Sequence, residues 1–539
     1  MDKGKSKVIE READKCENPA DKCENPPLRK EKGYGSSSRQ SEVTANRTEQ
    51  PVKTLMREVD DCEDDEMFYP ELQEANNIFK AVYKELMTIA FEANYYVEAV
   101  PALGSIEELQ KVFRISPPSD WRLETTTETA IVPISARSLC MNMMNLDSWH
   151  ASMSHIFHYV GGYIPDGVFK HLKDEDPSIL HVEMVNAEFQ LPTPFAAVRK
   201  FSFLRFLKEI IPDELWAIID VSKDYFQHID MDYMFEGKCR RRPSGVIIRA
   251  RDDHSEIIWI ENVEVPMLSQ FQDNIYSAII NSDVAFSAKR WVNAFLWNLK
   301  RYQSAFFIQE IKWGRPYYLF LLSLTKNMRL DFMKCLRESP DDRDWTLLTD
   351  HGMRIMQDAT MRSPEACKIC GYISVVSFRI QAKPHLVFQY LVKKNRQLQW
   401  HLFLDENEAK EVLRFAADDE SYLITLHQRS IITENSCGSE EYILQEASWD
   451  GFGYLIISAI MNQADVFCSL IAGYKDVDLK PSGFAIVPDG SDSSLVTFSL
   501  QEVLQVPDTH TGIRVKSCVA KRIISEIIEE MADVVKSAS

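Results

Sequence analysis

A series of short apolar or alternating segments, closed by one long amphipathic helix, is the feature that most restricts how this chain can fold. The segments run from residue 106 onward, are broken by Pro, Gly and Asp, and are rich in β-branched and aromatic residues. That pattern is typical of neighbouring antiparallel strands joined by short turns. The clearest examples are residues 182–189, 215–221, 245–250 and 257–263. We therefore predict an α+β domain in which a bent antiparallel sheet packs against a long helix.

The closing helix is expected to span about residues 282–306. Its apolar face is formed at helical spacing by Val284, Ala288, Trp291, Phe295, Leu299 and Tyr302. The basic residues Lys289, Arg290, Lys300 and Arg301 fall largely elsewhere, so the helix is amphipathic.

An earlier helix is expected from Leu72, with apolar residues repeating every three or four positions as far as Ala93. A leucine zipper would carry charged residues beside its apolar seam. Here Ile78, Tyr83 and Ala90 widen the stripe instead. We favour a helix packed on a globular body and keep a coiled coil as the alternative.

The second half of the chain repeats the same order of elements. A helix around Met328 and Phe332 precedes strand-like segments, and the chain ends in an amphipathic stretch. The expected strands are 371–380, 422–427 and 454–461, and the expected closing helix is 523–535. Trp149 followed by Pro243-Ser244-Gly245 is echoed by Trp400 followed by Pro481-Ser482-Gly483. We predict two divergent copies of one fold, at residues 71–306 and 307–539.

Residues 1–70 are nearly free of large apolar side chains, so we predict a disordered tail. Its Lys and Arg clusters are interpreted as solvated charge, with weak nuclear-import signals as the alternative. Cys16 and Cys23 lie in a duplicated heptapeptide and supply only half of a zinc shell.

Overall charge and cysteine usage exclude several classes of protein. The 539 residues carry 61 Lys and Arg against 81 Asp and Glu, a net charge of -20, which argues against phosphate-backbone binding. Eleven scattered cysteines indicate free thiols in a reducing compartment. We expect no signal peptide, and no apolar run approaches the roughly 20 residues that span a bilayer.

Motifs for catalysis and metal binding are also missing from the sequence. Cys367 and Cys370 have the spacing of half a zinc site, and no second pair completes it. His150, His155 and His158 are not expected to share one face of an extended segment. Neither a GxSxG elbow nor a phosphate-binding loop occurs. We predict no metal, no cofactor and no enzymatic activity. The basic run 238–242 is interpreted as a solvated hairpin edge, with nucleic-acid contact as the alternative.

Seven collinear stretches resemble a known family. They are 186–194, 215–222, 241–248, 259–265, 285–291, 344–348 and 479–488. In this order they are similar to the START lipid-binding domain and the adjoining C-terminal region of plant class IV homeodomain-leucine zipper transcription factors. The similarity covers about residues 72 to 505.

The resemblance implies a helix-grip fold, in which the sheet curls around the closing helix and encloses an apolar tunnel for one lipid or sterol. The stripe on that helix would form one wall, although a filled core needs the same residues. The candidate ligand-binding residues are Glu188, Arg199, Trp216, Asp220, Trp259, Trp291, Phe295 and Leu299. Arg199 in an apolar wall would need Glu188 or Asp220 as partner; otherwise it is an ordinary exposed Arg.

The family carries a homeodomain and a zipper upstream of this region, whereas residues 1–70 contain no Trp-Phe-x-Asn signature. We therefore expect no direct DNA binding. The leading hypothesis is a non-enzymatic lipid- or sterol-binding regulatory module in the nucleus, whose partners include related transcription factors. The alternative is a transcriptional regulator with a collapsed pocket that acts only through protein contacts. A cytoplasmic location is the alternative to the nucleus.

Overall fold

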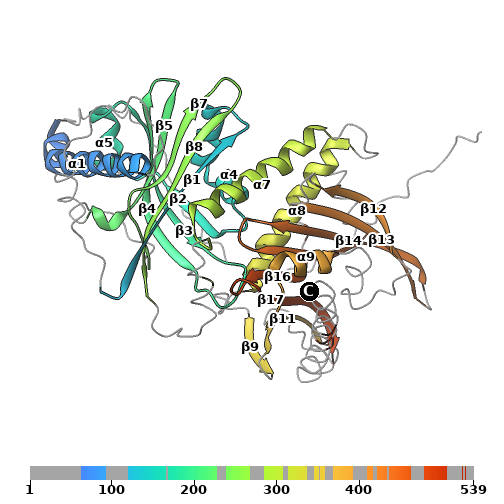
Figure 1. Cartoon of the computed structure of the whole chain (residues 1–539). Coiled ribbons are helices and arrows are strands. Elements are labelled where there is room, and N and C mark those ends of the chain that lie inside the picture. The colour runs from blue at the N-terminus through green and yellow to red at the C-terminus, as the bar shows by residue number, and fades with distance from the viewer. Residues whose placement is uncertain are drawn as a thin grey trace, which may run out of the picture. The chain divides into compact units, whose positions relative to one another are not determined.

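Two antiparallel sheets with helices packed on them form the fold in our computed structural model of the chain (Figure 1). The structure describes residues 62–92, 119–165, 168–226, 238–267, 279, 284–307, 314–336, 345–350, 353–358, 368–392, 409–416, 422–433, 436–462, 477, 479–506, 522, 525 and 529. The predicted tail up to residue 61, Cys367, Trp400 and most of the predicted closing helix 523–535 lie outside these residues.

The first sheet has the strand order β1-β8-β7-β5-β4-β3-β2, with every neighbouring pair antiparallel. Its strands are β1 (Trp121–Val132), β2 (Phe157–Tyr163), β3 (Ile179–Phe189), β4 (Arg199–Ile211), β5 (Leu215–Ser222), β7 (Ser244–Ala250) and β8 (Ser255–Pro266), with the short β6 (Arg240–Arg241) paired to β8. The four segments predicted most clearly from the sequence are β3, β5, β7 and β8. The predicted α+β class with an antiparallel sheet is confirmed.

Both faces of this sheet are covered, which explains why β5 reads as a continuous apolar run. Trp216 and Ile218 belong to a core on one face, whereas Ala217 and Ile219 belong to a core on the other. Successive side chains of a strand point to opposite faces, so one apolar run serves both cores. The helices beside these cores are α1 (Cys62–Glu92), α3 (Ala136–Met144), α4 (Leu146–Ser152), α5 (Val168–Glu175) and α7 (Ala288–Phe307), with the 3-10 turn η1 (Lys223–Tyr225) after β5.

Helix α1 packs on one face of the sheet, as the wide apolar stripe predicts. Ala75, Val82 and Leu86 are fully buried, and the ring of Phe79 lies 4.7 Å from that of Phe206 on β4. The globular interpretation is therefore confirmed over the zipper. The helix begins at Cys62, so the last part of the range predicted as tail is helical.

Helix α7 lies on the opposite face of the sheet. The core around it contains residues from all seven long strands of this sheet together with Trp291 and Phe295. Sequence patterning placed its start at Ser282, but residues 284–287 form a turn and the helix begins at Ala288. The Ser287 side chain accepts from the backbone N–H of Arg290 at 3.4 Å, satisfying a donor in the first turn.

Seven strands of the second sheet are arranged in the same spatial order as the seven long strands of the first sheet. Reading from β11, its order is β11-β17-β16-β15-β14-β13-β12, which repeats β1-β8-β7-β5-β4-β3-β2, and the hairpin β9–β10 extends the β11 edge. The elements are α8 (Gly314–Cys335), β9 (Trp345–Asp350), β10 (Met353–Asp358), β11 (Lys368–Ile380), α9 (Pro384–Val392), β12 (Ala409–Ala416), β13 (Tyr422–Thr433), β14 (Ser436–Trp449), β15 (Tyr454–Asn462), β16 (Ser482–Pro488) and β17 (Ser494–Val506). The predicted helix at Met328 and the three predicted strands of this half are confirmed.

The repeated Pro-Ser-Gly sequence makes the same serine hydrogen bonds and the same close glycine contact in both sheets. Ser244 Oγ bonds both backbone groups of Asn262 on β8, and Ser482 Oγ does the same with Gln501 on β17. A Cβ on the following glycine would overlap the carbonyl oxygen of Ile218 in one sheet and of Ile456 in the other. The shared order and this shared junction support the prediction that the halves are divergent copies.

Across the described residues, every helix is too short or too polar to span a bilayer.

Candidate functional site

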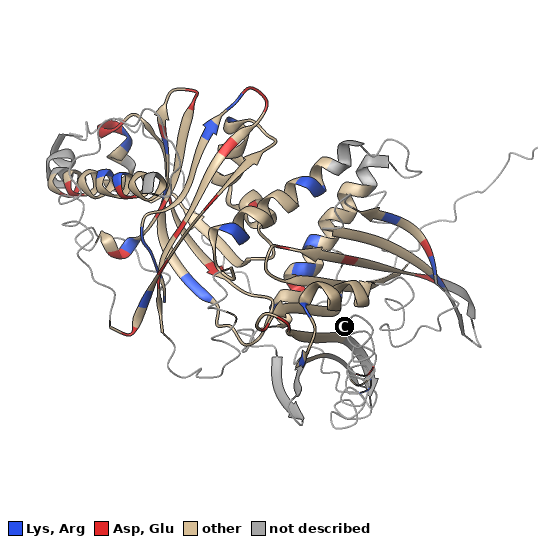
Figure 2. Ribbon diagram, viewed as in Figure 1, with Lys and Arg blue, Asp and Glu red and all other residues tan. Residues whose placement is uncertain are grey.

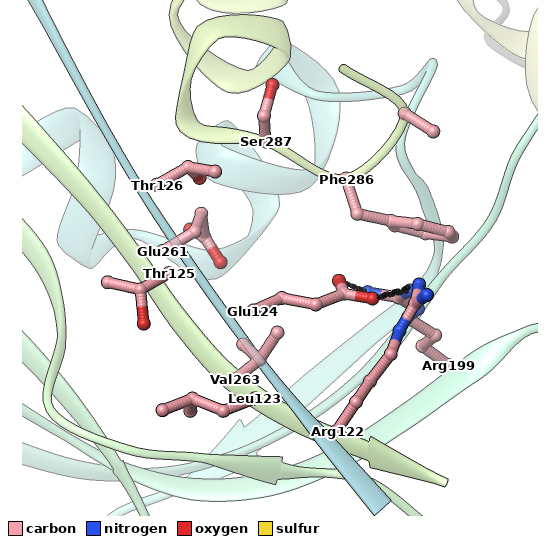
Figure 3. A pocket seen from close by; sticks show the side chains of 11 residues that line it. Arg122, Leu123, Glu124, Thr125, Thr126, Arg199, Glu261, Val263, Phe286 and Ser287 are labelled. Atoms are coloured by element: carbon pink, nitrogen blue, oxygen red, sulfur yellow. Dashed lines mark hydrogen bonds and ion pairs between the residues drawn. The ribbon is translucent and has the colours of Figure 1, made fainter. Parts of the chain in front are cut away.

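A pocket of about 300 Å³ opens beside the start of α7 (Figure 3). Its walls are residues 122–126 of β1, Arg199 of β4, Glu261 and Val263 of β8, and residues 285–287 of the turn before the helix. Strands β1 and β4 are separated in the sheet by β8, β7 and β5, yet both line this pocket. The sheet is therefore strongly bent around this end of α7.

An ion pair crosses the pocket between these two strands. The guanidinium of Arg199 donates to both oxygens of Glu124, at 2.7 and 3.0 Å, and Arg122 donates to the same carboxylate. Burial favours a higher pKa for Glu124, but the Arg199 and Arg122 charges outweigh it and hold the pKa below its ordinary value. Arg199 also stacks over the Phe286 ring at 3.7 Å. The sequence placed Glu188 or Asp220 opposite Arg199, and both assignments are wrong.

The floor of the pocket contains the buried carboxylate of Glu261. Its Oε1 accepts from Trp259 Nε1 at 2.9 Å and from the Arg241 guanidinium at 3.1 Å. Burial raises the pKa of Glu261, and the Arg241 charge opposes that rise. Thr126 Oγ1 accepts from the backbone N–H of Ala288, the first residue of α7, at 2.9 Å. The floor is thus fixed to both the sheet and the helix.

The basic run 238–242 is not the solvated hairpin edge that its sequence suggested. Arg241 is only 1% exposed and pairs with Glu261, while Arg242 Nε donates to Glu264 at 2.6 Å. Figure 2 shows charged residues of both signs along the strands of the first sheet. Because buried carboxylates lie opposite these arginines, the run contributes ion pairs inside the fold.

An aromatic cluster fills the space between α7 and the sheet behind the pocket. The ring of Trp291 lies 4.9 Å from Phe189, 5.3 Å from Phe157, 5.6 Å from Trp259 and 6.1 Å from Trp149. These centroid separations are those of rings in direct contact. The interior that the family resemblance assigns to a lipid is occupied here by side chains at these positions.

The other predicted residues are distributed through the same domain. Phe295 and Trp216 are buried in the aromatic core, and Leu299 packs against it while half-buried. Glu188 pairs with Lys200 Nζ at 2.9 Å on the β3–β4 face. Asp220 accepts from Arg205 through both oxygens at 2.8 Å. Of the eight predicted residues, Arg199 alone is among those that line the pocket.

Sequence reasoning missed Arg122, Glu124 and Phe286 as pocket residues. Positions 122 and 124 lie two apart in an extended segment and therefore face the same side, which is a usable local signal. Their pairing with Arg199 follows from the bend of the sheet, which no local pattern encodes.

The polar groups of the pocket are engaged by other groups of the protein. Both carboxylates are engaged by guanidinium groups, and Ser287 Oγ donates to the Val284 carbonyl at 2.9 Å. Among the described residues, no group of three or more His, Cys, Asp or Glu could hold a metal ion. His155, which is fully buried near Arg329, Arg301 and Arg290, has its pKa lowered by burial first and by those charges second.

Two family models match separate regions of the chain, and the first match begins after β1 and β2. Residues 166–300 match the family model described as START domain, and residues 319–511 match the one described as PDF2-like, C-terminal domain.

Curated relatives match both regions together. Homeobox-leucine zipper protein HDG3 of Arabidopsis thaliana is 23% identical over an alignment of 432 residues, and the match covers 74% of this chain and 56% of that protein. Homeobox-leucine zipper protein GLABRA 2 of the same plant is 22% identical over an alignment of 417 residues, and the match covers 74% of this chain and 53% of that protein. The chain spans about half the length of these relatives. Among solved structures, human StAR-related lipid transfer protein 5 matches 40% of this chain and 98% of its own, with 7% identity and a TM-score of 0.26.

Proposed function

Because the chain carries a START domain followed by a PDF2-like C-terminal domain, as the resemblance predicts, we propose that it is a non-enzymatic lipid- or sterol-binding protein with a regulatory role in the nucleus. The observation that carries this proposal is the pocket beside α7, where a charged rim adjoins the apolar interior of the START domain. A site with one polar end and one apolar end suits an amphipathic ligand.

Trp259 connects the two ends of the proposed site. Its indole N–H bonds Glu261 at the pocket floor, and its ring stacks on Trp291 inside the aromatic cluster. A volume of about 300 Å³ is at the lower limit for ligand sites. We therefore propose that the pocket receives the ligand's polar end beside Arg199, and that its apolar body enters by repacking the cluster. In this arrangement Trp259, Trp291, Phe295 and Leu299 contact the apolar body, and Glu188, Trp216 and Asp220 support the surrounding sheet.

A binding role without catalysis is favoured by the state of the pocket's polar groups. Glu124 and Glu261 are both held in ion pairs with arginines, so neither is placed as a free general acid or base. The hydroxyl of Thr126 accepts a backbone N–H at the start of α7. These groups hold the pocket's shape.

The nuclear and regulatory part of the proposal is supported by the relatives, which are named homeobox-leucine zipper proteins. A net charge of -20 opposes direct DNA binding by this chain. We propose that it acts through contacts with related transcription factors.

A second candidate function is supported by the packed rings around Trp291. If the cluster never opens, the START domain acts as a protein-contact module without a ligand. The two candidates differ in one measurable property, which is whether a lipid is bound.

Native mass spectrometry of the protein purified from its source tests the choice. A bound mass that extracts into organic solvent, together with binding to a panel of fluorescent sterols and fatty acids, supports the ligand-binding proposal. An Arg199→Met variant is expected to bind at least tenfold more weakly if a charged contact of about 1.5–3 kcal/mol is lost. Arg251→Met is the matched control, because Arg251 lies before β8 in the same domain and forms an exposed ion pair with Glu256. Absence of any lipid in repeated preparations, with no binding across the panel, would leave the protein-contact function.

The regulatory role is tested by nuclear fractionation and by recovery of partners from cross-linked nuclei. Homeobox-leucine zipper proteins among the recovered partners are the expected result. A wholly cytoplasmic protein that recovers none of them contradicts this part of the proposal.

A further inference from the structure

Arg290, in the first turn of α7, connects the two sheets through a buried ion pair. Arg290 and Asp450 are each 1% exposed, and Asp450 Oδ2 accepts from Arg290 Nε at 2.9 Å and from Nη2 at 2.7 Å. The remaining guanidinium N–H groups donate to the carbonyls of Ala285, Gln190 and His155, at 2.9, 3.3 and 3.0 Å. Every nitrogen of the Arg290 guanidinium therefore donates a hydrogen bond. Among these acceptors the one carboxylate, that of Asp450, belongs to the PDF2-like domain.

The turn that carries Asp450 is itself rigidly organised. It joins β14 to β15, and Asp450 Oδ1 accepts from the backbone N–H groups of Phe452 and Gly453 at 3.0 and 2.7 Å. The Asp450 backbone N–H also donates to the Gly453 carbonyl at 3.2 Å. One carboxylate thus closes its own turn with one oxygen and binds Arg290 with the other.

Apolar contacts surround this ion pair. Phe452 and Val487 from the second sheet share a buried cluster with Leu191 and Ala285 from the START side. The Arg290 guanidinium also lies 5.5 Å from the centre of the Phe452 ring. Because both side chains are buried, the ion pair is screened little by solvent.

The segment anchored in this way is a wall of the ligand pocket. Residues 285–287 line the pocket, and the backbone carbonyl of Ala285 in the same segment accepts a hydrogen bond from the Arg290 guanidinium. Phe286, in the same turn, supports the Arg199 guanidinium that pairs with Glu124. Displacement of Arg290 would therefore be transmitted to the pocket through three consecutive residues.

We propose that Asp450 is a positioning residue for the START pocket, so that the PDF2-like domain sets the shape of the site and ligand binding is coupled to the contact between the domains. The coupling to a ligand rests on the function proposed above. The positioning of residues 285–287 by Asp450 does not.

Hydrogen-exchange mass spectrometry on the full chain tests the positioning directly. Asp450→Asn removes the charge that holds Arg290, and the amides in a peptide covering residues 284–291 are expected to exchange about tenfold faster or more. Asp489→Asn is the matched control, because Asp489 is a buried turn carboxylate that pairs with Arg379 within the second sheet. It should leave that peptide unchanged.

A milder variant covers the case in which Asp450→Asn prevents folding. Phe452→Leu keeps the ion pair but removes the ring beside Arg290, and it should speed exchange of the same peptide by a smaller factor. Unchanged exchange at 284–291 in every folded variant of Asp450 or Phe452 overturns the proposal.

Titration with a fluorescent sterol then separates this inference from the proposed function. If the unaltered chain binds the sterol, Asp450→Asn should weaken binding while Asp489→Asn does not, and equal affinity overturns the coupling. If no variant binds any sterol or lipid while exchange at 284–291 still rises, the proposed ligand function fails and the positioning role stands.

Discussion

Replacing Trp291 by alanine tests whether the aromatic cluster is a packed core or the lining of an open cavity. The ring is buried and contacts four other rings, those of Trp149, Phe157, Phe189 and Trp259. A Trp→Ala change in a core costs about 3–5 kcal/mol, and aromatic pairs add about 0.5–1.5 kcal/mol each. With four such contacts, the cost should lie at the upper end, about 5 kcal/mol.

Urea denaturation of the full chain followed by circular dichroism measures this cost, as a shift in the midpoint at an unchanged slope. The matched control is Trp449→Ala, because Trp449 is 37% exposed at the end of β14 and its ring stacks on that of Tyr454 at 6.1 Å. That change should cost about 1 kcal/mol or less. A cost for Trp291→Ala near that of the control would refute the filled-core interpretation, since a ring lining an empty cavity loses few contacts when removed.

Three further predictions are tested by the same denaturation assay. Gly245→Ala and Gly483→Ala should each cost about 2 kcal/mol or more, because the new Cβ meets the backbone of a neighbouring strand. Gly245→Ala should cost more than Gly483→Ala, because Gly245 also has a positive φ of 140°. Gly490→Ala, whose new Cβ would lie 3.7 Å from its nearest atom, should cost about 1 kcal/mol. A loss at 245 or 483 no larger than the loss at 490 contradicts the shared junction. Asp220→Asn leaves Arg205 buried without its carboxylate partner and should lower the free energy of unfolding by about 3–5 kcal/mol. A loss under about 1 kcal/mol would show that the Arg205–Asp220 ion pair contributes little to stability. Burial raises the pKa of Glu85 from 4.5 to about 6, so the folded chain binds this proton more tightly and loses stability as pH rises through that window. Glu85→Gln should therefore stabilise by up to about 2 kcal/mol at pH 7 and give no gain below about pH 4.5.

Local patterns were sufficient for several elements of the fold. The strand around residues 182–189 and the helices around Phe79 and Trp291 are recognisable by their period, because the side chains that must face a core recur every second or every third to fourth residue. The strand around residues 215–221 is recognisable instead as a short, nearly continuous apolar run. The repeated Pro-Ser-Gly sequence also corresponds to a repeated structural contact, since each glycine lies so close to a neighbouring strand that no side chain fits there. The start of α7 was placed six residues early because the apolar spacing continues through the turn at 284–287.

Charged residues were the least predictable from the sequence. Arg241 lies in a run that reads as solvated, and its burial depends on Glu261, which lies on another strand. Arg199 was assigned to neighbours on adjacent strands, but its partner Glu124 lies across the bend of the sheet. A local pattern records the kind of residue, whereas an ion pair depends on which strands the curvature brings together.

The sequence by itself determined the α+β class, several of the strands and helices, and the family resemblance, because each of these is written in periodicity or in short collinear motifs. It also suggested two copies of one fold. Only the tertiary structure decided that aromatic rings occupy the space under α7, that the pocket lies at the helix start, and that Arg290 meets Asp450 from the other sheet. These last facts depend on how far the sheet bends and how the two copies pack. Contacts between residues more than a hundred positions apart are set by the packing of the whole chain, so no local stretch of sequence carries them.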